Sequence, residues 1–121
     1  MATMNSVIEY IDNIKPNVYS DDDKYRWMNS LDGMISIEVM EMDEAVEYKL
    51  PDDADMELLV KHPYDDIYAL YVAAMIDFYN REYNNYNNSV LMFSERYEAF
   101  KKWYIRTWPH KAAQNFINVM G

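Results

Sequence analysis

The chain of 121 residues contains no cysteine, which excludes disulfides, thiolate zinc sites and a thiol nucleophile. It has two glycines and four prolines, fewer turn-forming residues than an all-β or Rossmann-like chain normally carries. No window reaches the roughly 18 uninterrupted apolar residues of a membrane-spanning helix, and the first six residues lack the pattern of a signal peptide. We therefore expect one small all-α domain that is made in a cytoplasm and does not enter a membrane.

Groups that perform chemistry are scarce. The two histidines, His62 and His110, each lie beside a proline, and neither is three or four residues from another metal ligand on an expected helix. The acidic run 21–23 is explained by helix capping, and the run 52–57 lacks the glycine and terminal glutamate of a calcium loop. No glycine-rich phosphate loop or nucleophile elbow is present. We expect no enzyme activity, no cofactor and no metal site.

Charge divides the chain into two unequal parts. Residues 1–66 carry 17 acidic and 5 basic side chains, a net charge of −12, whereas residues 67–121 carry 4 and 6, a net charge of +2. Such polarity suits assembly in which unlike faces of neighbouring copies meet, although a solvated acidic surface would also account for it. The overall charge of −10 disfavours specific DNA binding, which needs a concentrated basic face.

The spacing of apolar residues predicts a first helix over about residues 5–14 and a second over about residues 21–42. The core-facing residues of the first helix are Val7, Ile8, Ile11 and Ile14. Those of the second helix are Met28, Leu31, Ile35, Val39 and Met42. We expect Asn5 or Ser6 to cap the first helix and Ser20 to cap the second.

Gly33 lies inside the second expected helix, where a glycine costs about 1 kcal/mol relative to alanine. A neighbouring segment packed closely over that position is the usual reason to keep it. Residues 43–63 then lose the helical spacing and predict an irregular or briefly β crossover. A crossover of this length inside a compact domain is uncommon unless it has a role such as binding a partner.

The second half of the chain predicts an antiparallel helical hairpin over about residues 66–80 and 83–107. The expected buried face of the first of these helices is Ile67, Leu70, Tyr71, Ala74, Met75 and Phe78. The last helix shows a heptad-type seam of Tyr86, Val90, Phe93, Tyr97, Phe100 and Tyr104. Because Trp108-Pro109 should end it, we expect a helical domain over residues 1–108 and a tail over residues 109–121.

Aromatic residues are more numerous in this hairpin than two small helices need for a core. Tyrosine and tryptophan are enriched at protein interfaces, so four of them are expected to contact a neighbouring subunit: Tyr68, Tyr79, Tyr83 and Trp103. Ordinary core and boundary positions would explain them equally simply. The tail either folds back on its own domain or docks into a partner's groove, through Trp108, Lys111, Phe116, Ile117, Val119 and Met120.

Several stretches resemble a known family. They are Ile14-Lys15-Pro16-Asn17 leading to Tyr19-Ser20, the run from Lys24 to Gly33 with Arg26-Trp27 and Leu31-Asp32, Pro63-Tyr64-Asp65-Asp66 with Tyr68, and residues 75–89 ending in Tyr86-Asn87-Asn88-Ser89. Together they resemble the head-tail connector, or adaptor, proteins of tailed phages and prophages of Gram-positive, Clostridia-like hosts. The resemblance covers about residues 10–107.

The resemblance implies a structural virion protein of the phage neck, assembled in the bacterial host cytoplasm. Such adaptors form a homo-oligomeric ring, usually of twelve copies, between the portal and the next neck protein, a stopper or tail terminator, and let genomic DNA pass without specific binding. By position, the tail would engage the portal. Arg81 occupies the inter-helix turn where a glycine is expected.

The alternative to an adaptor is a small acidic phage or host regulator that binds one protein partner.

Overall fold

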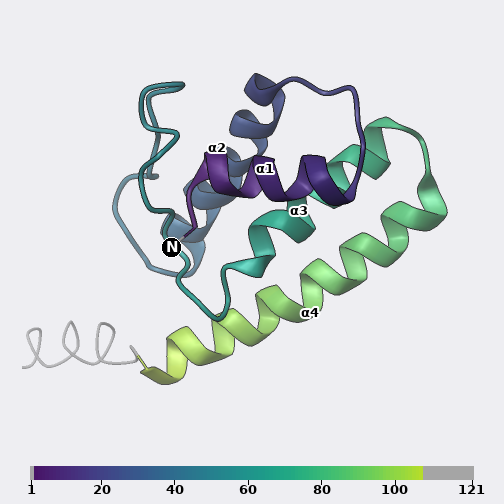
Figure 1. Ribbon diagram of the computed structural model, residues 1–121. Helices are drawn as coiled ribbons and strands as arrows, with labels where there is room; N and C mark the ends of the chain where they lie inside the picture. The colour runs from purple at the N-terminus through teal and green to yellow at the C-terminus, as the bar shows by residue number, and fades with distance from the viewer. Residues whose placement is uncertain (1, 108–121) are drawn as a thin grey trace, which may run out of the picture.

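The computed structural model describes residues 2–107, and these residues are all-α, as predicted. Four helices follow one another: α1 (Met4–Ile14), α2 (Asp21–Glu38), α3 (Asp66–Tyr79) and α4 (Tyr83–Thr107) (Figure 1). None of the described helices is long and apolar enough to cross a membrane. The expected tail, residues 109–121, lies outside the described residues.

The two N-terminal helices begin at side-chain caps. For α1 the cap is Thr3, whose hydroxyl accepts a hydrogen bond from the Ser6 backbone N–H at 3.1 Å, while Ser6 Oγ accepts one from the Thr3 N–H at 2.9 Å. The expectation of a cap at Asn5 or Ser6 is wrong, because Ser6 is the reciprocal partner in this capping box. For α2 the cap is Ser20, as predicted, with three aspartates in its first turn.

Helix α2 ends at Glu38, four residues before the predicted end. The backbone N–H groups of Val39 and Met40 both bond to the carbonyl of Ile35, and Glu41 adopts a left-handed φ of 55°. That backbone conformation cannot continue a right-handed helix. Met42, expected in the core, is consequently exposed.

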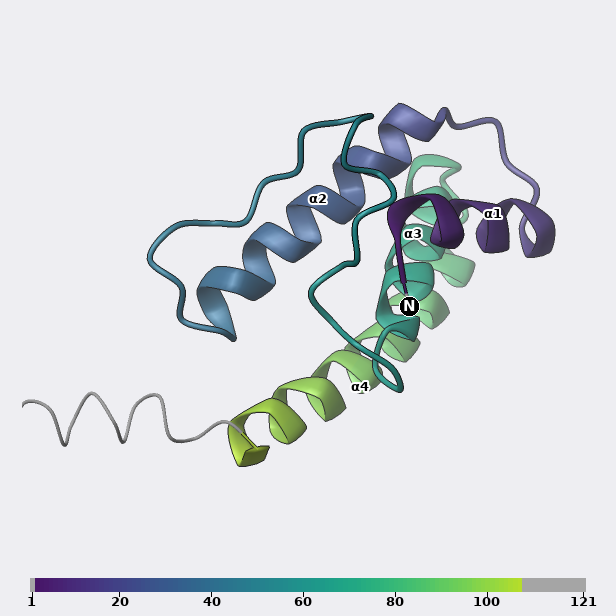
Figure 2. The ribbon, with the colours of Figure 1, turned by 60° about the vertical axis from the view of Figure 1, so that its left-hand side comes forward.

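The crossover from α2 to α3 runs back along α2 (Figure 2). It crosses Gly33 closely, because a Cβ atom built there would lie 3.4 Å from the carbonyl oxygen of Val46. Ser36 Oγ accepts a hydrogen bond from the Val46 N–H at 3.0 Å. The predicted close neighbour of Gly33 is therefore confirmed, and the crossover is irregular except for one bridge pair within residues 2–107, between Thr3 and Glu57.

Helix α3 is the centre of the fold. It pairs with α4 as an antiparallel hairpin (Figure 1) and also packs against α1 and α2. The predicted buried face of α3 is wrong in part, since Phe78 is exposed while Tyr68, Val72 and Ile76 are buried. The reason is that α3 is covered on more than one side, whereas a single helical stripe describes a helix with one covered face.

Helix α4 follows the predicted seam. Phe100 is fully buried, and the other five seam residues are half-buried against the rest of the domain: Tyr86, Val90, Phe93, Tyr97 and Tyr104. Large apolar side chains elsewhere on the helix are left in solvent, with exposed fractions of 59% for Leu91, 54% for Met92 and 62% for Ile105.

The turn between α3 and α4 lies where the sequence predicts it. Arg81 adopts a left-handed φ of 61°, the conformation for which a glycine was expected. Replacing Arg81 with glycine is expected to raise the free energy of unfolding by up to about 1 kcal/mol, because glycine adopts this conformation without steric cost. Urea unfolding checks this, with Asn80→Gly as the control. Asn80 has a φ of −76°, so its glycine variant should lose stability, and a loss in Arg81→Gly would contradict the prediction.

Candidate functional site

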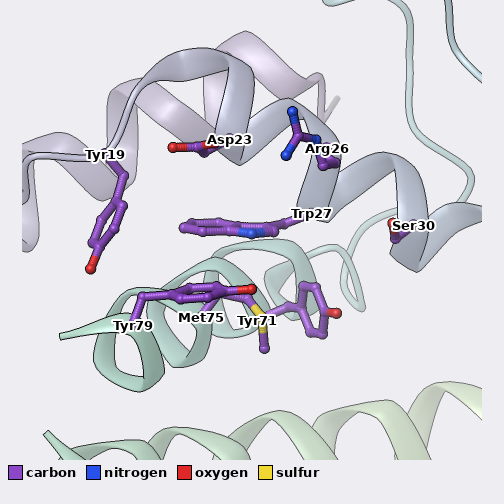
Figure 3. Close-up of a pocket in the computed structure, with 8 residues that line it drawn as sticks. All are labelled: Tyr19, Asp23, Arg26, Trp27, Ser30, Tyr71, Met75 and Tyr79. Carbon is purple, nitrogen blue, oxygen red and sulfur yellow. The ribbon is translucent and has the colours of Figure 1, made fainter. Parts of the chain in front are cut away.

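Three aromatic rings gather at the surface where the α1–α2 loop, α2 and the end of α3 meet (Figure 3). We call Tyr19, Trp27 and Tyr79 the aromatic cluster. Trp27 and Tyr79 are stacked, with ring centroids 5.7 Å apart and planes 8° from parallel. Tyr19 meets Trp27 edge-on at 5.7 Å and lies 6.2 Å from Tyr79. Each such pair stabilises by about 0.5–1.5 kcal/mol beyond its buried area, so the rings hold one another in place.

Hydrogen bonds fix the loop that carries Tyr19. Its hydroxyl donates to Asn80 Oδ1 at 2.8 Å, which ties the loop to the end of α3. Its backbone N–H donates to Asn17 Oδ1 at 3.1 Å, an arrangement typical of a turn stabilised by an asparagine side chain. Tyr19 is therefore held at both its backbone and its hydroxyl.

A buried carboxylate near the end of α3 links three helices. Asp77 in α3 is completely buried, and its Oδ1 lies 2.6 Å from Nζ of Lys15, just past the end of α1. Ser89 of α4 donates a hydrogen bond to Asp77 Oδ2 at 2.8 Å. A buried charge needs such partners, so this contact fixes the ends of α1 and α3 and the first turns of α4 relative to one another.

A pocket of about 440 Å³ opens beside the aromatic cluster. Tyr71 and Met75 of α3 add apolar surface to its wall, and α2 adds the polar residues Asp23, Arg26 and Ser30 (Figure 3). A concave surface with aromatic walls and a few polar groups is typical of a binding site for a side chain or small ligand.

The pocket's edge along α2 carries one charge of each sign. Asp23 lines the pocket, and Asp21 and Asp22 share the same helical turn. Arg26, one turn later, is exposed and forms no ion pair within residues 2–107. The pocket therefore offers a carboxylate and a guanidinium side by side along one helix.

A second buried polar centre holds the crossover in place. The carboxylate of Asp32 is buried in α2 and accepts hydrogen bonds from the hydroxyls of Tyr48 and Tyr68, both at 2.6 Å, and from the Leu59 N–H at 3.1 Å. Tyr68 also accepts a bond from the Val60 N–H at 2.8 Å. Burial raises the pKa of Asp32, and the three hydrogen bonds offset part of that rise.

This shifted pKa predicts a pH dependence. Because the pKa of Asp32 is higher in the folded protein than in the unfolded chain, the folded state holds the extra proton between the two values. The stability from this group is complete below the unfolded pKa of about 3.9 and falls as the pH rises through the folded pKa. The free energy of unfolding of the wild type relative to Asp32→Asn should therefore decrease with rising pH. A difference that grows with pH would contradict this, as would a constant one.

The structure separates the four aromatic residues expected at a subunit interface. Tyr79 and Tyr83 are accessible, with exposed fractions of 54% and 57%, and their contact with a neighbour stays a prediction. Tyr68 is fully buried, and its expected role is wrong because its hydroxyl is held by the crossover and Asp32. Trp103 is half-buried, with its ring centroid 5.4 Å from that of Tyr64.

The residues expected to bind a portal lie outside the described residues: Trp108, Lys111, Phe116, Ile117, Val119 and Met120. His110 also lies there. His62 is exposed, and its Nδ1 lies 3.9 Å from Oδ1 of Asp65. Within residues 2–107, no three acidic, histidine or cysteine side chains are grouped so that they could hold a metal ion.

Sequence reasoning missed Tyr19 and Trp27 as parts of the site. Both lie at or near the start of the second expected helix, but their partner Tyr79 is more than fifty residues away in the chain. Asp32 was also missed, although a carboxylate between Leu31 and Ile35 on a buried helix face indicates a buried polar contact. No protein-family model, curated protein or solved structure matches this chain.

Proposed function

We propose that this chain is a structural subunit of the neck of a tailed phage. It is an adaptor that forms a ring, expected to be twelve-fold, between the portal and the next neck protein, a stopper or tail terminator. Genomic DNA passes through the ring without specific binding. The structural observation that supports the proposal is the aromatic cluster beside its open pocket, which suits contact with another protein.

The rings of this surface continue beyond the aromatic cluster. The ring of Phe78 lies edge-on to that of Tyr79, with centroids 5.2 Å apart. Its centroid lies 5.4 Å from that of Tyr86 in α4. Phe78 and Tyr79 are both exposed to solvent, although each ring also packs against neighbouring rings. Rigid aromatic side chains lose little conformational freedom on binding, which is why interfaces concentrate their binding energy in them.

A second surface of a different kind lies on α4. Among the helices of residues 2–107, α4 packs against α3 alone, and it carries Leu91, Met92 and Ile105 exposed to solvent. A ring subunit must contact one neighbour with one surface and the other neighbour with a different surface. Two unlike apolar surfaces on one small domain support this mode of assembly.

The acidic regulator remains a second candidate because of one observation. The acidic side chains of the crossover between Glu41 and Glu57 are nearly all exposed, and Asp53 alone among them is half-buried. An exposed acidic surface can compete with nucleic acid for a basic partner. Such a protein would bind its partner in a fixed small number of copies and would need no ring.

Mixing the purified chain with a purified portal and measuring the mass of the complex tests the proposal. We expect many copies per portal ring, and one copy per partner or no portal binding would favour the regulator.

Deleting residues 109–121 should weaken portal binding and leave the helical content by circular dichroism unchanged. Replacing the same residues with glycine and serine is the matched control, because it keeps the length and removes the side chains. Tailed particles that form normally without this protein would contradict the adaptor role.

A further inference from the structure

We propose that the pocket beside the aromatic cluster receives the last turns of α4 from a second copy of this chain, with Ile105 of that copy entering the pocket. The inference rests on the proposed ring assembly and names the two surfaces that meet within it. The contact is heterologous, since a pocket on α2 and α3 meets a helix end on another part of the neighbouring copy.

The pocket side of this contact is walled by aromatic rings and carries Asp23 and Arg26 along one edge. Trp27 and Tyr79 lie parallel (Figure 3), and Tyr71 and Met75 also line the pocket. The volume of about 440 Å³ accepts a branched aliphatic side chain such as isoleucine. Asp23 stands at its edge in the first turn of α2.

The helix side of the contact has the opposite pattern. Ile105 is 62% exposed and lies among the basic residues Lys101, Lys102 and Arg106. Lys101 pairs with Glu98 of its own helix, but Lys102 and Arg106 form no ion pair within residues 2–107. An exposed isoleucine beside the unpaired cation of Lys102 complements an aromatic pocket with the carboxylate of Asp23 at its edge.

The order of charges also matches along the two helices. Glu98, Lys102 and Ile105 are spaced four and three residues apart, so they share one face of α4. Asp23 and Arg26 are three residues apart and share one face of α2. When the helices run antiparallel, Arg26 faces Glu98 and Asp23 faces Lys102. Ile105 then lies at the N-terminal end of α2, beside Tyr19 of the pocket wall.

A charge exchange tests this pairing directly. Asp23→Lys and Lys102→Asp should each weaken assembly about tenfold, and the double variant should restore it, because the pair is then reversed and not broken. Ile105→Asp should weaken assembly at least as much. Met56→Asp is the matched control, since Met56 is a comparably exposed apolar residue of the crossover and lies outside both proposed surfaces. The mass of the assembly is measured with and without the portal.

The absence of cysteine allows a second test by cross-linking. With the helices antiparallel, Ser30 of one copy lies near Glu95 of the next, so Ser30→Cys and Glu95→Cys chains should form a disulfide dimer when mixed. A mixture of Glu9→Cys and Glu95→Cys chains is the control and should form none. Dimers in the first mixture support the contact even when no portal binds.

Each contrary result has one meaning. Rings on the portal without cross-linking and without charge rescue would overturn the inference and leave the adaptor role standing. Assembly that survives Ile105→Asp would also overturn it. Cross-linked copies that never bind a portal would keep the contact and contradict the proposed function.

Discussion

Replacing Asp32 with alanine is expected to lower the free energy of unfolding by about 3–5 kcal/mol, a large part of the stability of a small domain. The substitution leaves three donors without their acceptor: the buried hydroxyls of Tyr48 and Tyr68 and the partly buried N–H of Leu59. It also opens a cavity in the core face of α2. Urea or thermal unfolding measures the loss.

Asp43→Ala is the matched control for this prediction, because Asp43 is exposed and should change stability by less than about 0.5 kcal/mol. Hydrogen exchange adds a local measurement. The amides of Leu59 and Val60 should lose protection in Asp32→Ala, since both are bonded to the Asp32–Tyr68 pair. A loss of stability below about 1 kcal/mol would show that this carboxylate does not hold the crossover.

Replacing Phe100 with alanine is expected to cost about 3–5 kcal/mol, the usual range for deleting a large buried aromatic side chain. Phe100 is the residue of α4 that is fully buried within residues 2–107. Its ring lies 6.1 Å from that of Tyr64 and 6.0 Å from that of Tyr104. The cavity would therefore remove packing contacts between the second half of α4 and the segment preceding α3.

Unfolding of Phe100→Ala is compared with that of Leu91→Ala on the same helix. Leu91 is 59% exposed, so its truncation removes few contacts and should be nearly neutral. Near-ultraviolet circular dichroism should also change in Phe100→Ala, because the surrounding rings lose their fixed packing. Equal stabilities of the two variants would contradict the packing of α4 described above.

The sequence predicted which helices exist, because their start signals are local. Ser20 and the apolar spacing of α1 and α2 act within a few residues, and the seam of α4 needs one covering partner. The end of α2 was predicted too late, because Glu41 adopts a left-handed backbone without the glycine that usually marks one. The face of α3 was predicted incorrectly because a helix with neighbours on several sides has no single apolar stripe.

The candidate site was less predictable than the fold. Tyr79 was expected at a surface, but Tyr19 and Trp27 join it through contacts between segments more than fifty residues apart, which a single sequence does not display. Tyr68 was assigned to an interface because aromatic residues exceeded the apparent needs of the core. Its real partner is a buried aspartate 36 residues earlier, and such long-range polar pairs have no local pattern.

The position of α3 has a consequence for the order in which the chain can fold. Helix α4 packs on α3, and Arg96 adds an ion pair to Asp66 at 2.9 Å, so the hairpin is built from contacts between neighbouring segments. Helices α1 and α2 form much of their shared core by packing against α3, and α3 is synthesised after them. During synthesis the acidic first half of the chain therefore cannot complete its core until α3 has been made. In that interval the charge of its exposed carboxylates keeps it in solution.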